Sequence, residues 1–244
     1  MQKVSLKKEY ISVDGSFGGN QRWLRKDADK ANTLSDYGCG LISANDVLLH
    51  ISDKANSTSK EKYIAAICKM NRRYFHVLPF LGVSGIMLSF YMRIYLFMHR
   101  KHFGKRYKVR WGVLPKRQFA CIKEMLENDI PVVLSIGPGL IRGRKKELPL
   151  YSLNESENSG TNKTYDIKGR DAINDNIDFT QVNSVKDHYV NVTGIIETEN
   201  STMLEISSWG KRYYIDYNEY RDFVRKHDNY LFSNILYIKI KQKM

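Results

Sequence analysis

Apolar side chains recur at helical spacing through the first half of the chain. After Cys39 they repeat every three or four positions as far as Ile51, which predicts a helix that starts near Cys39 and is capped by Ser35 or Asp36. The segment Thr58–Glu61 is typical of a helix-capping box. The apolar positions behind it predict a second helix that runs to about residue 75.

Two more helices are predicted before the middle of the chain. One covers roughly residues 83–99 and is rich in methionine and aromatic residues. The other begins at Pro115, which suits the first position of a helix, and stops at Asn128. In residues 1–34 the apolar positions follow neither helical spacing nor the alternation of a strand, so we expect an extended entry that is rich in loops.

The second half of the chain changes to alternation with period two, which is typical of strands. Strands are predicted at residues 107–113, 130–136, 189–196, 203–207, 212–217 and 230–241. A short helix is expected from Asn218 to near Lys226. Helices followed by an antiparallel sheet indicate an α+β fold. We therefore predict one domain over residues 1–244, with a helical half that carries Cys39 packed on the sheet and a cleft between them.

Residues 142–187 interrupt this order with many polar and few apolar positions. Structureless connections of this length are uncommon in compact domains and are usually functional or disordered. We interpret the segment as a surface insertion that serves as a lid or recognition loop, against the alternative of an insertion without a role. The basic residues at its start would favour acidic substrates: Arg142, Arg144, Lys145 and Lys146.

Composition excludes several classes of protein. Three cysteines are too few for a disulfide framework, and no metal-binding knuckle or nucleotide-binding loop accompanies them. Residues 78–98 are apolar, but Arg93 and several glycine, serine and proline residues argue against a membrane span. The N-terminus lacks the apolar core of a secretion signal. We expect a cytoplasmic protein without stable membrane insertion, metal or organic cofactor.

The net charge of +13 allows contact with anionic partners. No sequence motif for specific nucleic-acid recognition accompanies the basic clusters, so we predict no specific nucleic-acid partner. A basic solvated surface explains these clusters equally well, and the sharper alternative is an acidic substrate or partner.

Cys39 and His188 are the candidates for chemistry. Cys39 stands between two glycines at a predicted helix start, where the helix dipole and free N–H groups favour a thiolate. His188 opens a predicted strand 149 residues later. An imidazole can activate a thiol from any distance in sequence, and this separation is close to the ~130–150 residues of papain-type enzymes. Together they predict a nucleophile and its general base.

The histidine strand His188–Ile195 and the turn Ser207–Gly210 resemble the corresponding motifs of papain-like cysteine peptidases. The Gly-Cys-Gly helix start and the strand Ile130–Ser135 resemble the bacterial branch of that superfamily, which contains the bacteriocin leader peptidases. The resemblance implies a papain-like fold and cleavage of a peptide or protein substrate through a Cys39 thioester. It also implies that Trp209 shields the contact between the histidine and its orienting partner.

The resemblance further implies roles for Ser207 and Gln21. Ser207 stands where the family has asparagine or aspartate, so it would orient His188 with a shorter, uncharged side chain, unless Ser208 or a backbone carbonyl replaces it. Gln21 would supply the side-chain donor of the oxyanion hole. Two other functions stay open: acyl transfer or deamidation by the same residues, and a catalytically weak binding protein for an acidic partner. Products formed with an added amine would reveal transfer, and binding that survives Cys39→Ala would reveal the binding protein. Oligomeric state is not predicted.

Overall fold

A computed structural model describes residues 2–25, 33–52, 56–137, 146–154 and 178–240. The helices are α1 (Thr33–Tyr37), α2 (Cys39–His50), α3 (Lys60–Met70), α4 (Gly85–Met98), α5 (Pro115–Glu127) and α6 (Tyr217–His227). Short helical turns are η1 (Gln21–Leu24), η2 (Asn71–Phe75) and η3 (Arg100–His102). Helices combine with a large antiparallel sheet, so the α+β class is confirmed.

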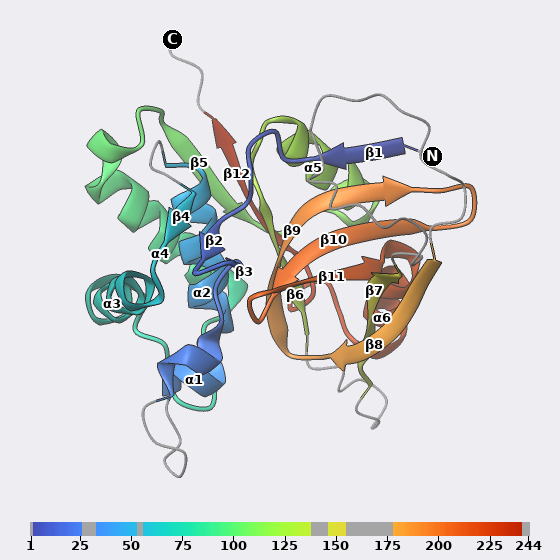
Figure 1. Cartoon of the computed structure of the whole chain (residues 1–244), viewed down its shortest axis with the longest axis horizontal. Coiled ribbons are helices and arrows are strands. Elements are labelled where there is room, and N and C mark those ends of the chain that lie inside the picture. Colours follow the sequence, from blue (N-terminus) through green and yellow to red (C-terminus); the bar gives the residue numbers. More distant parts are fainter. Residues whose placement is uncertain (1, 26–32, 53–55, 138–145, 155–177, 241–244) are drawn as a thin grey trace, which may run out of the picture.

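The large sheet follows the order β5-β12-β6-β9-β10-β11-β7-β8, and β1 also pairs with β9. Its strands are β1 (Gln2–Ser5), β5 (Tyr107–Trp111), β6 (Val132–Ile136), β7 (Leu148–Asn154), β8 (Asp178–Val185), β9 (His188–Glu197), β10 (Thr202–Ser208), β11 (Lys211–Asp216) and β12 (Ile235–Ile240). A small sheet joins β2 (Ser12–Val13), β3 (Ser16–Phe17) and β4 (Ser57–Thr58). Figure 1 shows α1–α4 gathered on one side of the molecule and β7–β11 with α6 on the other.

The helices begin close to the predicted positions, but several caps differ. Pro115 starts α5 as expected, and Ser59 caps α3 by accepting a hydrogen bond from the backbone N–H of Lys62. The predicted cap of α2 was wrong, because Gly38 precedes it without a side-chain hydrogen bond. Asp216 rather than Asn218 caps α6, through its carboxylate and two backbone N–H groups of the first turn.

Two regions hold strands that the sequence pattern did not predict. β1, β2 and β3 lie within residues 1–34, and β1 adds to the sheet beside β9. The segment 142–187 was expected to lack regular structure, yet its two ends form the antiparallel pair β7 and β8. β8 pairs through its backbone although its side chains are mostly polar, whereas β7 buries Leu148 and Leu150 at alternate positions. Residues 142–145 and 155–177 lie outside the described residues. They include three of the four basic residues that were predicted to favour acidic substrates.

The buried core lies between α2 and the centre of the sheet. Leu41, Val47 and Leu48 of α2 are buried, as are Val190 and Val192 of β9. The cleft predicted between the first long helix and the sheet coincides with this junction of α2 and β9.

None of the helices in the described part of the chain has both the length and the apolar character needed to cross a bilayer.

Candidate active site

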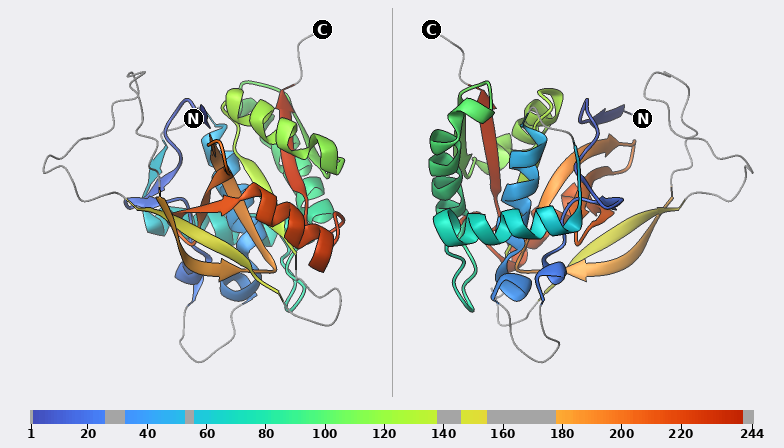
Figure 2. Two further views of the ribbon diagram at one scale, coloured as in Figure 1. Left: turned by 90° about the vertical axis from the view of Figure 1, so that its right-hand side faces the viewer. Right: turned by 60° about the vertical axis from the view of Figure 1, so that its left-hand side comes forward.

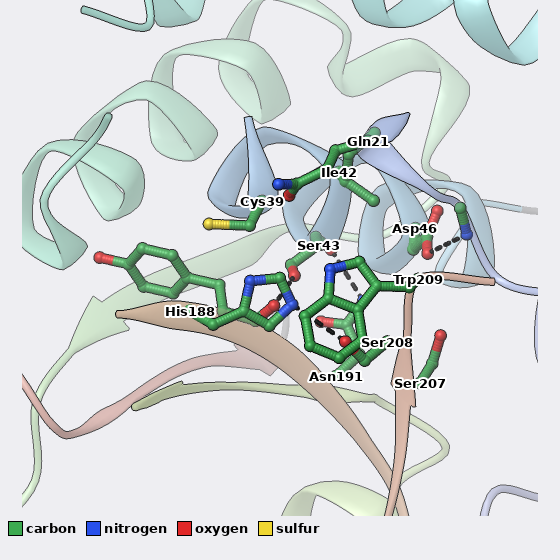
Figure 3. Close-up of a pocket in the computed structure, with 12 residues that line it drawn as sticks. Gln21, Cys39, Ile42, Ser43, Asp46, His188, Asn191, Ser207, Ser208 and Trp209 are labelled. Atoms are coloured by element: carbon green, nitrogen blue, oxygen red, sulfur yellow. Dashed lines mark hydrogen bonds between the residues drawn. The ribbon is translucent and has the colours of Figure 1, made fainter. Parts of the chain in front are cut away.

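A small pocket of about 10 Å³ lies at the junction of α2 and β9. All four predicted site residues line it, so the fold brings together segments from both halves of the chain (Figure 3). Its lining is Gly19, Gln21, Cys39, Ile42, Ser43, Asp46, His188, Tyr189, Asn191, Ser207, Ser208 and Trp209.

Cys39 is the first residue of α2, so its thiol lies where the helix presents free backbone N–H groups. The glycines on either side have steric reasons. A Cβ on Gly40 would lie 2.8 Å from Val83 and 3.2 Å from Tyr189, and a Cβ on Gly38 would lie 2.2 Å from the Leu34 carbonyl oxygen. Gly40 therefore allows the helix start to approach β9, and Gly38 allows α2 to follow α1 closely.

His188 is the first residue of β9 and is buried. Its Nε2 lies 2.9 Å from the Ser208 Oγ, and its ring stacks on the Trp209 indole with 4.6 Å between centroids and 23° between planes. In Figure 3 the imidazole lies between the Cys39 side chain and Ser208. Because Nε2 contacts Ser208, Nδ1 is the ring nitrogen that this contact leaves open.

The structure assigns the histidine contact to Ser208 and not to Ser207. Ser207 Oγ instead donates a hydrogen bond of 2.8 Å to the Phe17 carbonyl oxygen. Successive side chains of a strand point to opposite faces, so only one of the two serines can face His188. The pairing of β10 with β9 shifts register between Glu205 and Ile206, just before these serines. The prediction of Ser207 as the orienting residue was wrong by one position.

Gln21 begins η1, and Figure 3 shows its side-chain amide pointing toward Cys39. The loop before Gln21 is fastened to the turn that carries Trp209. Asn20 Nδ2 donates to the Trp209 carbonyl oxygen at 2.9 Å, and the Phe17 N–H donates to the Gly210 carbonyl oxygen at 2.9 Å. These bonds fix the position of Gln21 relative to His188.

Asp46 is a pocket residue that the sequence analysis missed. It is 1% exposed, and its carboxylate accepts hydrogen bonds from the Gly19 N–H at 2.8 Å and the Tyr63 hydroxyl at 2.6 Å. A longer bond of 3.4 Å comes from the Tyr10 hydroxyl. Burial raises the pKa of Asp46 to about 6. Its position seven residues after Cys39, two helical turns along the same face, was the available signal.

The pocket also changes the acid–base properties of the two central groups. Burial raises the pKa of the Cys39 thiol to about 11, although backbone hydrogen bonds oppose this. Burial, with a smaller effect of the Arg22 charge, lowers the pKa of His188 to about 4. Cys39 as a whole is only partly buried, yet loss of hydration at the thiol outweighs the effect of the helix N-terminus, so the predicted lowering of its pKa was wrong. At neutral pH both groups are uncharged.

The other cysteines lie elsewhere, with Cys68 exposed on α3 and Cys121 buried on α5. Among the described residues, no group of three or more histidine, cysteine and acidic side chains could hold a metal ion. Comparison with protein-family models and with characterised proteins found no match to this sequence. Assignment of a function therefore depends on the pocket itself.

Proposed function

We propose that the protein is a cysteine-dependent hydrolase with a papain-like fold, which cleaves a peptide or related amide bond through a Cys39 thioester. The observation that carries the proposal is the arrangement around His188. Its Nε2 contacts Ser208, its ring stacks on Trp209, and its other nitrogen remains for the thiol at the start of α2. Buried packing alone would not require a thiol, an imidazole and an amide donor to line one pocket.

In the first step, Cys39 Sγ attacks the carbonyl carbon while His188 Nδ1 takes the thiol proton. The resulting oxyanion needs donors that are already in place. The Gln21 amide N–H₂ and the backbone N–H of Cys39 are the two candidates, and such donors are worth ~3 kcal/mol each where they have been measured. His188 then gives the proton to the leaving amine as the C–N bond breaks, which leaves the thioester.

In the second step, a water molecule attacks the thioester carbonyl while His188 takes a proton from the water. The second oxyanion collapses, the C–S bond breaks, and the thiolate recovers its proton from His188. Ser208 contributes by holding the imidazole in one orientation through Nε2. The reaction needs Cys39 as a free thiol, in keeping with the cytoplasmic location expected from the sequence.

The neutral state of the pair gives the proposal a distinctive test. With His188 as general base, the alkylation rate of Cys39 by iodoacetamide should reach a plateau above about pH 5, because the pKa of His188 is about 4. An isolated buried thiol would instead gain about tenfold in rate per pH unit up to about pH 11. Site-resolved mass spectrometry can follow Cys39 and the exposed Cys68 in the same sample.

The matched variant is His188→Ala. We expect it to remove the plateau of Cys39 and to leave the labelling of Cys68 unchanged. The proposal fails if Cys39 shows the same steep pH dependence with and without His188, because the imidazole would then not act on the thiol.

A further inference from the structure

The outer side of α4 carries large apolar side chains that the described residues leave exposed. Five of them define what we call the α4 face: Ile86, Met87, Phe90, Phe97 and Met98. Phe97 is 68% exposed and Phe90 is 50% exposed. They follow helical spacing along the whole helix, so they lie on one side of it. In the right-hand view of Figure 2, α4 stands at the outer margin of the molecule, with α2 on its inner side.

This helix differs from an ordinary surface helix. Its inner side is buried through Leu88, Met92 and Leu96, yet Arg93 is the only charged residue among its 14 positions. A surface helix usually presents charged or polar residues to water, and a helix that is apolar all round is usually covered on every side. The α4 face therefore has the composition of a covered surface.

The net positive charge of the chain comes from the segment of sequence that contains this helix. Between Glu61 and Glu124 the sequence has 14 lysine and arginine residues and no aspartate or glutamate. The whole chain has a net charge of +13, so this segment accounts for the excess. Arg100 lies 5.7 Å from the centre of the Phe97 ring, which puts a cation directly beside the apolar face.

Further cations follow the end of α4 in the connection to the outermost strand of the sheet. Lys101 follows in η3, and Lys105 and Arg106 are exposed in the connection that leads to β5. Strand β5 packs against α4, where the Arg93 Nε donates to the Val109 carbonyl oxygen at 2.9 Å. The C-terminal end of the α4 face is therefore flanked by exposed basic residues.

We propose that the α4 face binds the surface of an anionic lipid bilayer. The helix would lie in the plane of the interface, with its phenylalanine and methionine side chains at the headgroup–acyl boundary and the adjacent lysine and arginine side chains at the anionic headgroups. Its 14 residues extend about 21 Å, too short to span the hydrocarbon core. An anionic bilayer offers apolar acyl chains to the phenylalanine and methionine side chains and negative headgroups to the basic residues. An acidic groove on another protein would also have to supply a matching apolar lining. This inference does not depend on the catalytic proposal.

The test is sedimentation of the purified chain with vesicles of phosphatidylglycerol and phosphatidylcholine. We expect binding to the mixed vesicles, little binding to pure phosphatidylcholine, and weaker binding as salt screens the charges. The double variant Phe90→Glu with Phe97→Glu should bind at least about tenfold more weakly, since each phenylalanine contributes apolar burial. Val182→Glu is the matched control, because Val182 is 51% exposed on β8 at the opposite end of the sheet.

A second pair of variants keeps the test valid if the double variant does not fold by circular dichroism. Arg100→Glu and Lys101→Glu leave the apolar face intact and should also reduce binding to anionic vesicles. Absence of binding at low salt would overturn the proposal. Equal binding by wild type and by folded Phe90→Glu with Phe97→Glu would also overturn it, because charge alone would then explain adsorption. If the wild type sediments as a dimer and the double variant as a monomer, the α4 face would instead be the contact with a second copy of the chain.

Discussion

Replacement of Asp46 by asparagine should change how the stability of the protein depends on pH. The Asp46 carboxyl is buried at the end of the pocket, where its pKa is raised from 3.8 to about 6. Asparagine retains an oxygen that can accept from the Gly19 N–H, and its N–H₂ can donate to the Tyr63 hydroxyl oxygen. The variant therefore removes the ionisation while it keeps much of the hydrogen bonding.

The sign follows from proton binding. A raised pKa in the folded state means that the folded protein holds more protons on Asp46 than the unfolded chain between about pH 4 and pH 6. The contribution of Asp46 to the free energy of unfolding therefore falls as pH rises through this window and is constant above it. A shift of about two pKa units corresponds to about 3 kcal/mol.

Urea unfolding of both proteins from pH 3.5 to pH 7, followed by tryptophan fluorescence, measures this effect. The free energy of unfolding of Asp46→Asn minus that of wild type should rise by about 3 kcal/mol between pH 3.5 and pH 7. Protonation of His50 and His188, whose pKa values are lowered to about 4, destabilises both proteins on acidification and cancels in the difference. Parallel stability curves for the two proteins would refute the assignment of a buried, ionising Asp46.

Three further predictions concern the roles of individual pocket residues. Ser208→Ala should slow the His188-dependent alkylation of Cys39 at pH 7. Ser207→Ala should slow it less, because only Ser208 contacts the imidazole. Equal effects of the two variants in the same labelling assay would contradict this. Ser207→Ala should lower the free energy of unfolding by about 1 kcal/mol through loss of its bond to the Phe17 carbonyl, as measured by urea unfolding. Once a cleavable peptide is available, Gln21→Ala should reduce kcat by about 10²-fold or more with little change in iodoacetamide labelling, since alkylation forms no oxyanion.

Sequence patterns predicted the elements that are determined by local periodicity. The helix at Cys39, the helix that starts at Pro115 and the strand at His188 all form close to the expected residues because burial of one face dictates their spacing. The strands β1, β7 and β8 were missed because their pairing partners are distant in sequence or their side chains are mostly polar. Pairing of this kind is decided by the backbone of the neighbouring strand.

The site was predictable in its members more than in its details. Cys39, His188 and Gln21 carry chemical signals in the sequence, and all three line the pocket. The choice between Ser207 and Ser208 depends on strand register, and the pairing of β9 with β10 shifts between Glu205 and Ile206 without any mark in the hydrophobic pattern. The raised thiol pKa depends on how completely the pocket excludes water, which is a property of packing.

The turn between β10 and β11 explains how residues from the two ends of the chain reach one pocket. Trp209 and Gly210 both have positive φ, 50° and 75°, which suits the two-residue hairpin turn that joins these strands. Positive φ is unusual for a tryptophan, and here the same residue stacks on His188 while its carbonyl oxygen accepts from Asn20. The turn thereby sets the position of the imidazole and of the Gln21 loop together. Because one turn carries both constraints, displacement of Trp209 would separate the proposed base and the proposed oxyanion donor in a single movement.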